Sequence, residues 1–113
     1  MKRNLVIIAE CIEALINYKE NKQKRIADHG EDEVRKACNQ AIYRISVYFP
    51  LIALYDKLIG YKVPSLLDVA TYTMSKKELD FERIDKLVAD LEKDLPKINN
   101  FIKILPDDWE RNG

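Results

Sequence analysis

Apolar residues recur at intervals of three and four along most of this chain, and this helical period is the strongest constraint on its fold. One stripe runs along the segment 3–25 and comprises Leu5, Ile8, Ile12, Leu15 and Ile16. A second stripe lies on another side of the same segment and comprises Ile7, Cys11, Ala14 and Tyr18. A helix that is apolar over so wide an arc is either central in a bundle or buried by a partner chain.

The same period continues in two later segments. From about residue 31 the apolar face is formed by Val34, Ala37, Cys38, Ala41, Ile45 and Tyr48, and its small members permit close approach of another helix. After a capping box at Ser75 and Glu78, a further face is formed by Phe81, Ile84, Leu87, Val88, Leu91 and Leu95. Asp90 and Asp94 are expected on the exposed side of that last helix.

These segments predict an all-α fold, namely a four- to five-helix antiparallel bundle with Pro-kinked helices. Pro50 and Pro96 either kink helices or separate them, and a short helix is expected at about residues 66–73. We expect a single helical domain over residues 1–106, followed by a charged C-terminal tail over 107–113.

Composition excludes several classes of function. The 113 residues carry 19 basic and 19 acidic side chains, so neither a globally basic nucleic-acid binder nor an acidic nucleic-acid mimic is favoured. One histidine and two cysteines support neither a zinc site nor a disulfide scaffold. Three residues lie between Arg25 and His29, whereas four to six separate the arginine and the histidine in the motif of the HEPN ribonucleases. We therefore expect no catalytic residues, no metal and no cofactor.

The localisation expected from the sequence is cytoplasmic. The apolar run after Lys2 and Arg3 ends at Glu10, which is too early for a signal peptide. The longest uncharged stretch, residues 45–55, is much shorter than the roughly 20 residues that a membrane-spanning helix needs. Hence no membrane partner is expected.

Aromatic side chains gather in the middle of the chain, and some of them lie off the expected apolar faces. Tyrosine and tryptophan are favoured at protein interfaces because they combine a large apolar area with a polar tip. The residues expected to bind another protein are Tyr43, Val47, Tyr55, Tyr61 and, in the tail, Trp109. The alternative for these aromatic residues is a place in the bundle core and its loops.

Two further surfaces follow from the first segment. If its second stripe is not covered within the monomer, then Ile7, Cys11, Ala14 and Tyr18 should form a homodimer interface. The end of the segment has a local net charge of +3 and could contact phosphates through Lys19, Lys22, Lys24 and Arg25. Nucleic-acid binding by a regulatory protein is therefore the alternative function.

The function expected from the sequence is non-catalytic binding to another protein, such as a toxin, a nuclease or another effector. In size and helical architecture the chain is similar to toxin and bacteriocin immunity proteins and to phage-encoded inhibitors such as anti-CRISPRs. That similarity implies inhibition by occlusion, in which a rigid helical face covers the partner's site.

Overall fold

The computed structural model describes residues 2–53 and 78–104. Four α-helices occupy these ranges: α1 (Lys2–Glu20), α2 (Lys22–His29), α3 (Glu31–Ala53) and α6 (Phe81–Ile104). The two ranges contain no strand, so the prediction of an all-α fold is confirmed for them. The short helix expected at 66–73 and the tail at 107–113 lie outside the described residues.

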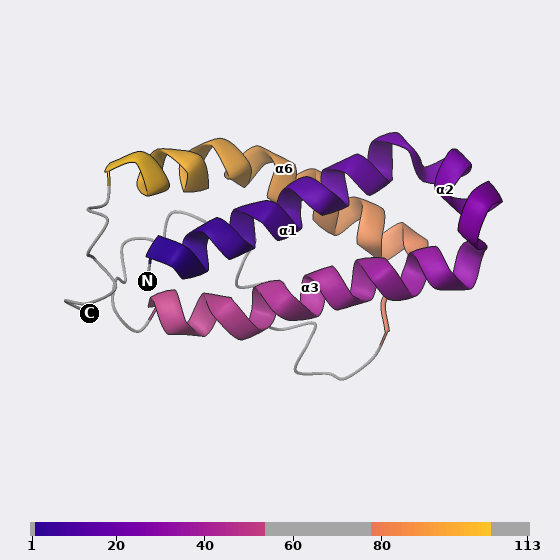
Figure 1. Ribbon diagram of the computed structural model, residues 1–113, viewed down its shortest axis with the longest axis horizontal. Helices are drawn as coiled ribbons and strands as arrows, with labels where there is room; N and C mark the ends of the chain where they lie inside the picture. Colours follow the sequence, from indigo (N-terminus) through magenta and orange to yellow (C-terminus); the bar gives the residue numbers. More distant parts are fainter. Residues whose placement is uncertain (1, 54–77, 105–113) are drawn as a thin grey trace.

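The central element is α1, which packs against both α3 and α6 and runs antiparallel to each (Figure 1). In contrast, α3 and α6 contact each other at only a few positions. Leu5, Ile8 and Ile12 have no exposed surface, so the first predicted stripe forms the core. The wide apolar arc of α1 is thus explained to a large extent by two neighbours on two sides of one helix.

The helix predicted over 3–25 is interrupted at Asn21, where the backbone adopts φ −115° and ψ 22°. The Asn21 side-chain amide donates a hydrogen bond to the Asn17 carbonyl oxygen at 3.0 Å. Asparagine competes in this way with the helical backbone ladder, which makes it a frequent point of interruption. After the break, α2 begins at Lys22 and places Ile26 against the core.

Gly30 makes the turn between α2 and α3 with a φ of +87°, a backbone conformation that favours glycine. Its N–H donates to the Ile26 carbonyl at 2.9 Å, which closes the end of α2. The first turn of α3 carries three acidic residues, as expected for the positive end of a helix dipole. Both α3 and α6 continue through their prolines, Pro50 and Pro96, so neither proline separates two helices.

The start of α6 is fixed by Asp80, whose side chain accepts a hydrogen bond from the Arg83 N–H at 2.9 Å. Just before it, the buried Leu79 is held against α3 by Asn39. The Asn39 amide donates to the Leu79 carbonyl at 3.1 Å, and its oxygen accepts from the Leu79 N–H at 2.9 Å. This pair of hydrogen bonds ties the beginning of α6 to the middle of α3.

The exposed position expected for Asp94 is wrong, because this side chain is only 5% exposed. Leu91 and Ile98 are buried on the inner side of α6. Residues three and four positions apart share one side of a helix, so both Asp94 and Leu95 are close to this inner side. The nearest cation in the described part is Lys97, whose Nζ lies 3.9 Å from one carboxylate oxygen of Asp94.

Candidate protein-interaction surface

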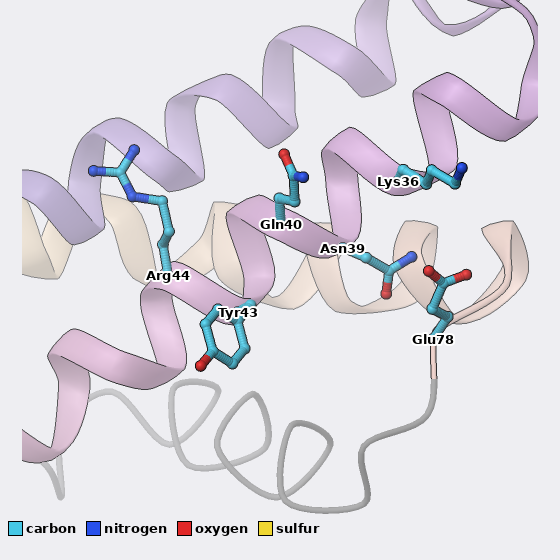
Figure 2. Close-up of a pocket in the computed structure, with 6 residues that line it drawn as sticks. All are labelled: Lys36, Asn39, Gln40, Tyr43, Arg44 and Glu78. Atoms are coloured by element: carbon cyan, nitrogen blue, oxygen red, sulfur yellow. The ribbon is translucent and has the colours of Figure 1, made fainter.

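The outward side of α3, here called the α3 face, comprises Lys36, Gln40, Tyr43, Arg44 and Val47. Tyr43 is 59% exposed and Val47 is 46% exposed, which is unusual for large apolar side chains among the described residues. A pocket of about 480 Å³ opens beside them, and its lining includes Asn39 and Glu78. Figure 2 shows Gln40 and Arg44 directed toward α1, with Tyr43 on the other side of the helix.

The polar side chains of the α3 face have no partner within the part of the chain that the structure describes. Within residues 3–48 and 78–104, those of Lys36, Gln40 and Arg44 form no hydrogen bond and no ion pair. Their donors are therefore available to another molecule, next to the apolar surface of Tyr43 and Val47. Exposed tyrosine and arginine side chains are typical of the residues that dominate protein interfaces.

Of the five residues expected to bind protein, the structure places Tyr43 and Val47 together, one helical turn apart on α3. Tyr55, Tyr61 and Trp109 lie outside the described residues. The sequence analysis missed Lys36, Gln40 and Arg44. Their spacing of four residues places them in one row on a helix, and that row lies beside the row of Tyr43 and Val47.

The stripe expected at a dimer interface is divided by the structure. Cys11 is 7% exposed and Tyr18 is 3% exposed, so both belong to the core of the monomer. Burial also raises the pKa of the Cys11 thiol. Ile7 is partly buried, whereas Ala14 is exposed. Tyr18 is therefore covered within the chain and cannot serve as an exposed contact.

Tyr18 lies in what we call the junction cluster, which comprises Tyr18, Lys22, Phe81 and Asp85. The Tyr18 hydroxyl donates to Asp85 at 3.1 Å, and the Lys22 ammonium donates to the other carboxylate oxygen at 2.9 Å. The Tyr18 ring stacks on Phe81 with centroids 6.2 Å apart, and the Lys22 Nζ lies 4.7 Å above the same ring. Burial, followed by the hydrogen bond to Asp85, raises the pKa of the Tyr18 hydroxyl.

The basic cluster at 19–25 is largely engaged within the chain. Lys19 pairs with Glu92 at 3.4 Å, and Lys22 pairs with Asp85 at 2.9 Å. The Arg25 guanidinium donates to the side-chain oxygen of Asn17. Lys24 is exposed. Two of the four positive charges are thus matched by carboxylates of α6, which lowers the charge available for phosphates.

A smaller pocket of about 270 Å³ lies where α1 and α2 meet α3. Its lining includes Arg25, His29, Glu33 and Cys38. Burial raises the pKa of the Cys38 thiol to about 11, and the nearby Asp85 charge adds to this shift. A thiol of that kind is neutral at physiological pH and is a poor nucleophile.

The described part of the chain holds no cluster of three or more histidine, cysteine or acidic side chains suited to a metal ion. In the same residues, none of the helices has the length and apolar character needed to cross a membrane.

Neither a family model, nor a curated protein, nor a solved structure matches this chain.

Proposed function

We propose that this chain is a non-catalytic protein that binds another protein through the α3 face. The observation that carries the proposal is the exposed pair Tyr43 and Val47 beside Lys36, Gln40 and Arg44, whose polar groups have no partner among the described residues. The pocket beside Tyr43 would receive an apolar side chain of the partner. The flanking donors would pair with carbonyl or carboxylate oxygens around it.

The mechanism we propose is occlusion of a site on the partner, which would be a toxin, a nuclease or another effector. The α3 face is carried by a 23-residue helix, which the central α1 supports. A face of this kind docks with little loss of conformational entropy, since its backbone is ordered before binding. Binding alone is then sufficient to block the covered site.

The test starts with a photo-crosslinking residue introduced at Tyr43 in the source cell, with Lys93 on α6 as the matched control position. Both side chains are exposed, but only Tyr43 belongs to the α3 face. We expect one protein to be crosslinked from position 43 and not from position 93. Binding of that purified protein should then weaken about 30-fold in Tyr43→Ala, as for an interface hot spot, and remain unchanged in Lys93→Ala.

Equal affinity of the wild type and Tyr43→Ala for the crosslinked protein would contradict the proposal. Val47→Ala serves as a second variant, since it removes apolar contact area without changing the hydrogen-bonding groups of the face. We expect it to weaken binding about fivefold.

Nucleic-acid binding through Lys19, Lys22, Lys24 and Arg25 remains the alternative proposal. It has less support, because Lys19 and Lys22 are already paired with Glu92 and Asp85. It predicts binding that weakens steeply with salt and that is lost when Lys24 is changed to Glu. The α3-face proposal predicts that Lys24→Glu leaves partner affinity unchanged.

A further inference from the structure

A third depression, here called the α1–α3 groove, is lined by residues of α1 and α3. It has a volume of about 250 Å³. Its lining comprises Ile7, Glu10, Cys11, Ala14, Ala37, Gln40, Ala41 and Arg44. Ala14 and Ala37 are exposed, and Cys11 is buried. The short side chains leave room for another helix to approach closely.

The two sides of the groove carry opposite charges. Glu10 stands on the α1 side and Arg44 on the α3 side, and both side chains are exposed. Both line the same groove, on either side of Cys11. Neither forms an ion pair or a hydrogen bond with another side chain of residues 3–48 or 78–104. The groove thus has an acidic rim, a basic rim and a small apolar floor.

From this charge pattern we infer that the α1–α3 groove binds a second copy of the chain, with a two-fold axis parallel to the two helices. Such an axis lays α1 of one copy over α3 of the other, so Glu10 meets the partner's Arg44 twice in the dimer. Because α1 and α3 are antiparallel (Figure 1), every neighbouring pair among the four helices is then antiparallel as well.

The alternative two-fold arrangement is disfavoured by the same charges. An axis perpendicular to the helices would lay α1 on α1 and α3 on α3. The acidic rim of one copy would then lie opposite the acidic rim of the other, and the basic rim opposite the other basic rim. Like charges placed opposite each other oppose association.

The groove shares Gln40 and Arg44 with the α3 face, but its lining does not include Tyr43 or Val47. Tyr43 lies on the side of α3 away from α1, whereas Arg44 is directed toward α1 (Figure 2). A second copy in the groove therefore does not need Tyr43. Among the residues expected at a dimer interface, Ile7, Cys11 and Ala14 line the groove, but the buried Tyr18 does not.

The test is a charge exchange, followed by sedimentation velocity of the full chain from about 1 to about 200 micromolar. We expect the wild type to dimerise in this range. Glu10→Arg and Arg44→Glu should each weaken dimerisation at least about tenfold, because each places like charges across the interface. The double variant should recover to within about threefold of the wild type, since the exchanged pair is again complementary. Lys93→Glu on α6 is the surface-charge control and should leave dimerisation unchanged.

A wild type that stays monomeric throughout this range would overturn the inference. So would a double variant that is no better than the single ones, since the charges would then not meet across the axis. Tyr43→Ala separates the two proposals, because it should weaken the partner protein and leave the dimer intact.

Discussion

The junction cluster and the α3 face use similar side chains in opposite ways. At the junction, Tyr18 and Lys22 both donate to Asp85 and both contact the Phe81 ring. On the α3 face, Tyr43 and Arg44 are also an aromatic ring and a cation, but they are exposed and have no such partner among the described residues. The same chemistry stabilises the fold at one place and remains available at the other.

The contrast between the junction cluster and the α3 face indicates which polar groups are suited to recognition. A polar group that is satisfied inside the molecule gains little from an external ligand, since binding would first have to break an existing contact. A group without an internal partner exchanges only water for the ligand. The α3 face is therefore the better candidate for recognition, although the basic cluster at 19–25 has the higher local charge.

The largest change in the free energy of unfolding is expected when Tyr18, rather than Tyr43, is replaced by alanine. Tyr18→Ala removes a buried ring, its stacking on Phe81 and its hydrogen bond to Asp85, so we expect a loss of about 4 kcal/mol in the free energy of unfolding. Tyr43→Ala should change that free energy by less than about 0.5 kcal/mol, because the side chain is 59% exposed. Urea denaturation of the two variants measures both values. Similar losses in both would show that Tyr43 is also part of the core.

A second, smaller effect compares two neighbouring amides on α3. Asn39→Ala leaves the N–H and the carbonyl of the buried Leu79 without their partners, so we expect a loss of about 3 kcal/mol. Gln40→Ala, one position further, is the matched control and should be nearly neutral, since the Gln40 amide is exposed. Thermal or urea unfolding measures the loss of stability in each variant. An equally small loss in Asn39→Ala would mean that water replaces the Asn39 side chain at the backbone groups of Leu79.

Much of the fold could be predicted because it depends on local periodicity. The stripe of Leu5, Ile8 and Ile12 predicted the core. The wide apolar arc predicted a helix that is either central or buried by a partner chain, and in the structure α1 is central. The break at Asn21 was missed, because the apolar pattern continues across it and a single side-chain hydrogen bond decides the backbone path. The burial of Asp94 was not predicted, because the apolar spacing does not determine which of two adjacent positions, 94 or 95, lies on the inner side of the helix.

The candidate site could be predicted less completely, because pairing between distant residues leaves no trace in the spacing. Lys22 and Asp85 are 63 positions apart, so the sequence alone left the charge of Lys22 available to phosphates. Whether Tyr18 is covered within the monomer stayed open for the same reason, as nothing in its own segment indicates that Phe81 stacks on it. The spacing placed Tyr43 and Val47 off the main apolar face of their helix and left a place in the core open for the tyrosine, and the structure has both side chains exposed.

The last and smallest change in stability concerns the titration of the Cys38 thiol at alkaline pH. The pKa of Cys38 is raised from 9.0 to about 11, first by burial and then by the Asp85 charge. A pKa that is higher in the folded state favours the neutral thiol, so this contribution is complete below pH 9 and is lost as the pH rises toward 11. Two pKa units correspond to at most about 3 kcal/mol, and we expect a loss of about 2 kcal/mol by pH 11.

Cys38→Ala removes this titration and keeps all four residues of the junction cluster. One of them is Tyr18, whose raised pKa also makes stability depend on pH in the alkaline range. Urea denaturation at pH 7, 9, 10 and 11 should therefore show that the wild type loses about 2 kcal/mol more than the variant over the alkaline range. Parallel profiles for the two proteins would mean that water reaches the thiol from the pocket of about 270 Å³ where α1 and α2 meet α3. The junction would then be less closed than its hydrogen bonds and ring contacts indicate, and its contrast with the α3 face would be one of charge pairing alone.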